Sequence, residues 1–472
     1  MATHARALRH TLFRSDSHRD ANARNSPGRP KLTPEILNSL SLTERECLDA
    51  FPGLTKSIDD VVAEGPFKLK NTGDLGPLQG RIRDGKIYII NAQRRKDLSA
   101  EMLNPQSSPA TQDHLHQADD RRSNVKSRTA ALHQLHRALL TAPEPLPDTI
   151  FTINFQDQPF GTAWGYSTPA DPAHRGDRAR DPDKRLFLMP HFSFWAWPLP
   201  FVGSVARAAR AIAAVEDSHH DRHEGGSLAS KDPRAVWRGT SWFNSVHSPR
   251  LRQDLLAAAR DKPWADVQPL RWDASPASAG GSHNASNAIP IEDFCRHRYV
   301  LHTEGVAYSG RFQFLQMCRS VTLTPAIHWL QHTTHLVRPV FAAEIPGLIR
   351  DPAVAEKARA ARERSRRAWP AGYDPAREAN IVFVAPDWSD LEDAVAWLEA
   401  NPRVAEGIAA RQRETFVGGG YFSPAAEACY WRALVRGWHS VARWDEAEWE
   451  GKEEVTFEAF ALTQEMPSDR AR

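Results

Sequence analysis

Residues 298–324 constrain the fold most strongly, because they place a glycine-containing turn between strand-like and helix-like segments. The runs Tyr299–Leu301 and Val321–Leu323 have the residue types of short strands, and Phe312–Cys318 is apolar at helical spacing. The order strand, turn, helix, strand is typical of a doubly wound α/β domain. Ligands of such domains bind beyond the carboxyl ends of the strands, where this turn is expected to lie.

The turn itself has residues suited to a phosphate group. It consists of Gly305, Val306, Ala307, Tyr308, Ser309, Gly310 and Arg311. The two glycines allow the backbone to approach a ligand closely, and backbone N–H groups at the start of a helix favour an anion. The guanidinium beside them adds a planar fork that matches phosphate oxygens. An ordinary corner between a strand and a helix uses the same residue types, so the local sequence leaves both interpretations open.

A second candidate for phosphate contact ends another predicted strand, Arg234–Thr240. Its last residues, Arg238, Gly239 and Thr240, bring a guanidinium, a glycine that permits close approach and a hydroxyl to one point. The alternative is that Arg238 pairs with a buried carboxylate and has a structural role only.

Composition limits the other classes of function. The chain has 472 residues, enough for two or three domains, and its formal net charge of +2 gives no reason to expect a nucleic-acid partner. No run of about 18 apolar residues is present, so no transmembrane helix is predicted. Residues 1–30 are basic and polar without the apolar centre of a signal peptide, and we expect them to be disordered.

Several blocks of the chain resemble characteristic segments of glycosyltransferase family 90, the capsule-associated xylosyltransferases and protein O-glucosyltransferases. In chain order they are FTINFQDQP (151–159), KDPRAVWRGTSWFNSVHSPR (231–250), TEGVAYSGRFQFLQMCRSV (303–321), and FVAPDWSDLEDAVAWLEANP (383–402) followed by ACYWRALV (428–435). Each block is short, but their order matches over roughly residues 40–445. The resemblance implies an α/β protein of GT-B-like architecture, in which two Rossmann-like domains face each other across a cleft.

The resemblance also implies a catalytic base and a diphosphate site. The predicted strand Thr149–Phe155 leads into Asp157, which matches the acid of the family's short Asp-x-Pro motif. Inverting transfer needs such a carboxylate, because the acceptor hydroxyl loses its proton as it attacks the sugar. A lone loop aspartate is otherwise a turn former. Arg238, Gly239, Thr240 and the whole 305–311 turn would hold the donor diphosphate, with two guanidinium groups in place of a metal ion.

The donor nucleoside and sugar would contact Trp329, Gln331 and His332, which resemble the family's Trp-x-Glu element. Gln331 stands where many members carry glutamate, so hydrogen-bonding capacity remains without the charge. Two alternatives stay open for this segment. It is merely structural and polar, or His328, His332 and His335 share one helical face and bind a metal ion.

The cysteine count is compatible with disulfides. The four cysteines are Cys47, Cys295, Cys318 and Cys429. An even number allows two bridges in any of three connectivities, and four reduced buried thiols are an equal alternative. The resemblance implies the pairs Cys295–Cys318 and Cys47–Cys429, and therefore an oxidising compartment.

We predict four regions from these features. They are a disordered tail over 1–40, an N-terminal acceptor and catalytic-base domain over 41–228, a C-terminal UDP-sugar-binding domain over 229–424, and a return helix with a polar tail over 425–472. Polar insertions are expected at 104–126 and 340–379. Thr43–Glu46 and Ser389–Glu392 have the pattern of capping boxes that open helices.

The resulting hypothesis is an inverting glycosyltransferase that moves xylose or glucose from a UDP-sugar to a hydroxyl of a glycan or glycoprotein. The UDP-sugar is a co-substrate, and we expect no metal, no other cofactor and no nucleic acid. Disulfides and resemblance together point to the secretory lumen, in the endoplasmic reticulum or Golgi. Membrane association would need a segment that this sequence does not show. The alternative is a noncatalytic glycan- or nucleotide-binding protein on the same scaffold.

Overall fold

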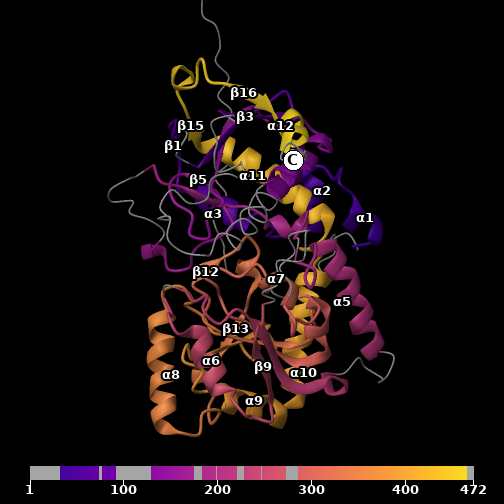
Figure 1. Cartoon of the computed structure of the whole chain (residues 1–472), viewed down its shortest axis with the longest axis vertical. Coiled ribbons are helices and arrows are strands. Elements are labelled where there is room, and N and C mark those ends of the chain that lie inside the picture. Colours follow the sequence, from indigo (N-terminus) through magenta and orange to yellow (C-terminus); the bar gives the residue numbers. More distant parts are fainter. Residues whose placement is uncertain are drawn as a thin grey trace, which may run out of the picture.

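The described residues form two lobes, each built on a six-stranded sheet (Figure 1). The computed structural model describes residues 32–73, 77–91, 129–174, 183–197, 199–220, 228–245, 247–272 and 285–464. Residues 1–31 and the insertion expected at 104–126 lie outside this part of the chain. The predicted α/β fold class is confirmed.

The sheet of the first lobe is mixed. In spatial order its strands are β16 (Glu454–Thr456), β3 (Lys86–Ile90), β2 (Leu78–Arg83), β4 (Thr149–Ile153), β5 (Ala163–Gly165) and β7 (Leu186–Leu188). The pairings from β16 to β4 are antiparallel, and those from β4 to β7 are parallel. Asp84 and Gly85 turn the β2–β3 hairpin with φ values of 50° and 72°, which suits the right-handed twist of the paired strands.

Helices from both ends of the chain cover this sheet. They are α1 (Pro34–Asn38), α2 (Glu44–Ala50), α3 (Lys56–Val62), the helical residues 129–140, α11 (Pro424–Val441) and α12 (Phe457–Gln464). The capping box at Thr43–Glu46 is confirmed at the start of α2. Helix α1 falls within the tail predicted as disordered, and it packs against α11.

The segment after α11 adds strands and a helix to the first lobe up to Gln464, and residues 465–472 of the predicted polar tail lie outside the described part of the chain. Strand β15 (Ala442–Arg443) pairs with β1 (Phe67–Lys68), and β16 extends the main sheet beyond β3. Phe457 and Phe460 of α12 are buried in the core of the first lobe. The end of the chain therefore completes the lobe in which the chain begins.

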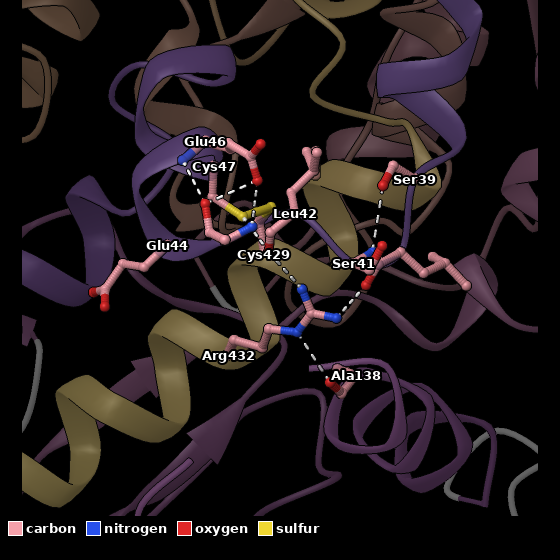
Figure 2. Close-up of a disulfide and its surroundings, with 12 residues drawn as sticks. Ser39, Ser41, Leu42, Glu44, Glu46, Cys47, Ala138, Cys429 and Arg432 are labelled. Atoms are coloured by element: carbon pink, nitrogen blue, oxygen red, sulfur yellow. Dashed lines mark hydrogen bonds between the residues drawn. A yellow bond between two sulfur atoms is a disulfide. The ribbon is translucent and has the colours of Figure 1, made fainter. Parts of the chain in front are cut away.

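Both predicted disulfides are present. Cys47–Cys429 joins α2 to α11, with 5.7 Å between the Cα atoms, and Cys295–Cys318 lies within the second lobe, with 4.9 Å. Arg432 lies beside the first bridge (Figure 2), and its guanidinium donates to the backbone carbonyls of Leu40, Leu42, Ala138 and Thr141. One arginine of α11 thus ties three separate segments of the first lobe together.

The sheet of the second lobe is parallel throughout. In spatial order its strands are β13 (Pro339–Phe341), β14 (Ile381–Val384), β11 (Val321–Pro325), β10 (His297–Leu301), β8 (Asp232–Gly239) and β9 (Ala265–Pro269). Its helices are α5 (Val205–His220), α6 (Leu251–Ala258), α7 (Phe312–Leu315), α8 (Pro352–Ser365), α9 (Leu391–Ala400) and α10 (Pro402–Arg413). Because all strands run the same way, the loops after β8, β10, β11 and β14 emerge at one edge.

Two details of this lobe differ from the sequence predictions. The capping box at Ser389–Glu392 is wrong: α9 begins after Asp390 without a side-chain cap, because that carboxylate accepts the backbone N–H of Ala385 instead. Helix α5 was placed in the first domain, yet its Ile212 packs in the same apolar cluster as Val236 and Phe294 of the second lobe.

The insertion predicted at 340–379 is not simply a solvated loop. It contributes part of β13 to the sheet and contains α8, of which Ala358 and Arg362 are buried. The Nε1 of Trp369 donates to the carbonyl of Ile327 at 2.8 Å, which holds the insertion against the loop after β11. The sequence analysis did not predict this packing, because α8 is rich in charged residues and its apolar face consists only of a narrow row of alanines.

The lobes meet through a small sheet and an aromatic cluster. Strand β6 (Thr168–Pro169) of the first lobe pairs antiparallel with β12 (Trp329–Leu330) of the second. The rings of Tyr166 and His191 lie 6.1 and 5.6 Å from the ring of Tyr308, across the boundary. Within the described residues, no helix is long and apolar enough to cross a membrane.

Candidate active site

The glycine turn lies at the carboxyl edge of the parallel sheet, as the sequence predicts. It follows β10 directly and leads into α7. Neither Gly305 nor Gly310 has a positive φ, so left-handed backbone is not what requires them. A Cβ at Gly310 would lie only 2.5 Å from Nε2 of His191, a side chain of the first lobe. Glycine is therefore required at this position because any larger residue would clash with His191. The turn is thus part of the contact between lobes.

Asp157 belongs to the first lobe and lies near this turn. It follows β4 in an exposed loop, where its backbone carbonyl accepts the hydroxyl of Ser167 at 3.0 Å. The next residue, Gln158, donates its Nε2 to the carbonyl of Val306 at 3.3 Å, so the loop touches the turn. Desolvation by surrounding protein raises the pKa of Asp157 above its usual range, although the side chain opens to solvent. A raised pKa suits a group that accepts a proton during a reaction.

Tyr308 connects the two elements electrostatically. Its side chain is 9% exposed, and burial, followed by the charge of Asp157, raises its pKa well above the usual value. It therefore stays neutral and is able to donate a hydrogen bond. The sequence placed Tyr308 in the turn without predicting this contact.

The two arginines predicted at the diphosphate have different surroundings. Nη2 of Arg238 donates to both carboxylate oxygens of Asp266, at 2.8 and 3.0 Å, so Arg238 already has a carboxylate partner. Arg311 donates Nη1 to the backbone carbonyl of Arg238, and no carboxylate among the described residues pairs with it. Burial lowers the pKa of Arg311 to about 10. Arg311 is therefore the guanidinium of the two that best suits an anionic ligand.

Gly239 and Thr240 complete the end of β8. The Thr240 hydroxyl accepts Nε1 of Trp272 at 3.1 Å, so it is already engaged. Its carbonyl accepts Nη1 of Arg252 at 2.7 Å. A Cβ at Gly239 would lie 2.5 Å from the ring of Trp237, so here too glycine is needed for packing.

Arg252 was missed by the sequence analysis. It lies on α6, is 5% exposed, and donates to the carbonyl of Glu304 directly before the glycine turn. Burial, together with the charge of Arg311, lowers the pKa of Arg252 to about 9. The available signal was its spacing of three from the apolar Leu255, which places both on one helical face.

Trp329, Gln331 and His332, which were predicted to contact the nucleoside, do not lie together in the structure. Trp329 lies in β12 and faces His247, with 6.2 Å between ring centroids. His332 is buried against Tyr430, with ring centroids 5.0 Å apart, and burial lowers its pKa to about 3. Gln331 lines a small cavity of about 80 Å³ that also contains Ser57 of the first lobe. Gln331 and His332 are thus positioned by the first lobe rather than by the turn.

The alternative of a histidine metal site does not fit this segment. His328, His332 and His335 do not share a helical face, because the chain forms β12 and a tight turn here. His335 contacts the carbonyl of Gly53 at 2.8 Å, and His328 lies 3.4 Å from Glu304. The three imidazoles therefore point to three different neighbours.

Comparison of the sequence with known proteins gives a family for part of the chain. Residues 114–342 match the sequence model described as "Glycosyl transferase family 90". The chain carries a glycosyltransferase family 90 domain. It is 21% identical over 299 residues to "Protein O-glucosyltransferase 1" of Bos taurus, covering 61% of this chain and 62% of that protein. It is 22% identical over 206 residues to "O-glucosyltransferase rumi" of Drosophila melanogaster, covering 43% and 47%.

The extent of these matches is itself informative. The matched region spans less than two thirds of the length of these curated relatives. The family 90 domain includes Asp157, Arg311 and the whole glycine turn. It ends at Ala342, within the insertion predicted over 340–379 and before α8.

Proposed function

We propose that this protein is an inverting glycosyltransferase that moves xylose or glucose from a UDP-sugar to a hydroxyl of a glycan or protein. The observation that carries the proposal is that Asp157 of the first lobe lies across the glycine turn of the second lobe, linked by the contact of Gln158 with Val306. Family 90 membership of the domain supports the same chemistry. The lobes then correspond to the two domains of a GT-B-like enzyme, the first for the acceptor and the second for the donor.

In this mechanism Asp157 removes the proton from the acceptor hydroxyl. The freed oxygen attacks the anomeric carbon from the face opposite the UDP, a new C–O bond forms, and the bond from that carbon to the phosphate oxygen breaks. The electron pair stays on UDP, whose added charge is stabilised by Arg311 and by backbone N–H groups of the turn. No metal ion is needed if these groups supply the whole electrostatic stabilisation.

The compartment follows from the same reasoning. Two disulfides fix segments of both lobes, and such bonds persist in oxidising surroundings. We therefore propose that the protein works in the lumen of the secretory pathway. A noncatalytic protein that binds UDP-sugars or glycans on the same scaffold is the second candidate.

Donor hydrolysis tests the proposal without knowledge of the acceptor. UDP release from UDP-xylose and from UDP-glucose is measured with EDTA present for wild type and Asp157→Asn. We expect release with one donor, reduced about 10²–10⁴-fold in the variant, because proton transfer to a positioned base contributes about that factor. Asp148→Asn is the matched control, since Asp148 precedes the same strand β4 at its opposite end. Equal activity in wild type and Asp157→Asn would reject the base, and UDP binding without release even with candidate acceptors would favour the noncatalytic alternative.

A further inference from the structure

His302 is a buried histidine between the end of β10 and the glycine turn that begins at Gly305. Its side chain is 2% exposed, and its backbone N–H donates to the carbonyl of Leu323 in β11 at 3.0 Å. Because side chains alternate along a strand, it faces the same side of the sheet as Val300. Its ring lies 4.4 Å from the ring of Phe312 in α7, measured between centroids. His302 is therefore placed between the sheet and the helix that follows the turn.

The imidazole has a nitrogen that the described part of the chain does not satisfy. Nδ1 of His302 is buried and has no hydrogen-bond partner among the described residues. Buried polar atoms in folded proteins are almost always hydrogen-bonded, so this exception calls for an explanation. Burial, followed by the charges of Arg311 and Arg252, lowers the pKa of His302 well below its usual value. The ring is therefore neutral in the protein without a ligand.

Arg311 lies close to this ring. In the β8–β10 ladder Val300 pairs with Val236, and two residues further along the strands stand His302 and Arg238. Arg311 donates Nη1 to the backbone carbonyl of Arg238. The guanidinium of Arg311 is thus held at the strand position beside His302, which agrees with the effect of its charge on the imidazole.

Arg252 approaches the same strand end from α6. Its Nε and Nη2 donate to the carbonyl of Glu304 at 3.2 and 2.9 Å, and its Nη1 donates to the carbonyl of Thr240 at 2.7 Å. Among the residues that the structure describes, no carboxylate forms an ion pair with Arg252 or with Arg311. Two buried positive charges and a neutral imidazole, that of His302, are therefore clustered at the start of the turn.

The acidic groups beside this cluster are engaged by other partners. The carboxylate of Glu304 accepts the backbone N–H groups of His328 and Trp329 at 3.0 and 2.8 Å. The carboxylate of Asp266 accepts Nη2 of Arg238. The positive charge of the cluster is therefore complementary to an anion. A diphosphate bound there would offset the repulsion between the guanidinium groups and a protonated imidazole, because a nearby negative charge favours the charged form of a base.

We propose that His302 is a positioning residue for the donor: it takes up a proton when a diphosphate binds at the glycine turn, and its imidazolium then stabilises the bound diphosphate. The inference rests on the proposed function, which places a diphosphate at Arg311. The proton comes from the solvent, and both ring nitrogens of the imidazolium are hydrogen-bond donors. Since linkage between proton and ligand is reciprocal, uptake of a proton on binding makes the donor bind more tightly as the pH falls.

Calorimetric titration with a UDP-sugar measures this proton. UDP-glucose and UDP-xylose are titrated into Asp157→Asn, which leaves the donor intact and removes the titration of that carboxyl group. Buffers of different ionisation enthalpy give the number of protons taken up. A UDP-sugar is used because the terminal phosphate of UDP itself titrates at a pH of about 6. We expect uptake of about 0.5–1 proton at pH 6, and an affinity about tenfold higher at pH 6 than at pH 8.

Two histidine variants in the same background identify the group that takes up the proton. His302→Gln keeps hydrogen-bonding capacity without ionisation, so we expect no uptake and the same affinity at both pH values. His297→Gln is the matched control, because His297 is buried at the other end of β10, where its Nδ1 contacts the carbonyl of Arg234 at 3.1 Å. It should take up the proton as the parent does. Thermal unfolding checks both variants, and His302→Asn replaces His302→Gln if that variant does not fold.

Each outcome decides the inference. Donor binding without proton uptake and without pH dependence would show that the inference is wrong, while the transferase proposal stands. Proton uptake that persists in the His302 variant would assign the proton to another group and would also reject it. If neither UDP-sugar binds at either pH, both the inference and the proposed donor fail.

Discussion

The two lobes bury arginine side chains in different ways. In the first lobe, Arg432 is 2% exposed and donates to four backbone carbonyls. In the second lobe, the hydrogen bond that Arg311 makes within the described residues goes to a single carbonyl, that of Arg238. Burial lowers the pKa of each to about 10. Of these two arginines, only Arg432 has its donors satisfied by the fold. Arg432 therefore supports the first lobe, whereas Arg311 retains donors for an anion.

Removing the disulfides tests the scaffold role and has the largest expected effect. Cys47–Cys429 closes a separation of 382 residues, and Cys295–Cys318 closes one of 23. The loop-closure model gives about 6 kcal/mol for the long bridge and about 3.5 kcal/mol for the short one, as upper values. We expect Cys47→Ser with Cys429→Ser to lower the free energy of unfolding more than Cys295→Ser with Cys318→Ser.

Denaturant unfolding of the two double variants, without reductant, measures this difference. UDP affinity is the control and is measured without denaturant, where the variants are folded. We expect the Cys47→Ser, Cys429→Ser variant to bind UDP as tightly as wild type does. A larger loss of stability from the short bridge would break the contrast between the lobes, because it would make the second lobe the part that depends on crosslinking.

The two buried arginines give the sharpest version of the comparison. Arg432→Met leaves four backbone carbonyls without this donor, one of them in the buried residue Ala138, and we expect a loss of about 3–5 kcal/mol in the free energy of unfolding. Arg311→Met removes a buried charge that has no carboxylate partner among the described residues, so stability should change by less than about 1 kcal/mol. UDP affinity should instead fall about 10–100-fold, the worth of a charge-assisted contact.

Thermal unfolding and UDP titration of both variants separate the two effects. We expect opposite effects of the two substitutions. Arg432→Met should unfold at a lower temperature but bind UDP as wild type does, whereas Arg311→Met should unfold as wild type does but bind UDP more weakly. A loss of stability in Arg311→Met equal to that in Arg432→Met would assign Arg311 a structural role.

Local patterns in the sequence predicted the elements that carry the site. The strand–turn–helix–strand order of 298–324 is confirmed. It could be predicted because the spacing of apolar residues and the positions of the glycines are properties of the local sequence. The strand before Asp157 and the disulfide pairs were predicted as well, the pairs through the resemblance to family 90. These features depend on short segments whose residue types are distinctive.

Features that depend on distant contacts were not predictable. Arg238 has the same sequence neighbours whether it binds phosphate or Asp266, and only the β8–β9 pairing decides between them. The β16 strand was missed because its three residues gain their partner, β3, from the other end of the chain. The buried face of α8 was not predicted because it is formed largely by alanines, which give only a weak hydrophobic pattern in the sequence.

A buried acid extends the comparison to negative charges. In the first lobe, Glu427 is buried and pairs with Arg137. In the second lobe, Asp390 is fully buried at the start of α9, and its carboxylate accepts the backbone N–H of Ala385. Burial raises the pKa of Asp390 to about 6, against about 3.9 in an unfolded chain. The folded protein therefore holds a proton between pH 4 and 6 that the unfolded chain releases, so stability falls as pH rises through this window.

Asp390→Asn should remove that dependence, with the smallest expected effect. The asparagine oxygen keeps the bond from Ala385, and the ionisation disappears. We expect the variant to match wild type near pH 4 and to be more stable by about 2–3 kcal/mol at pH 7, since a shift of about two pKa units corresponds to about 2.8 kcal/mol. Denaturant unfolding at several pH values measures the difference, with the exposed Asp49→Asn as control, for which we expect less than about 0.5 kcal/mol at any pH. A constant difference between pH 4 and 7 would mean that Asp390 keeps its charge in the folded state and is stabilised by its surroundings, as the scaffold lobe stabilises Glu427 through Arg137.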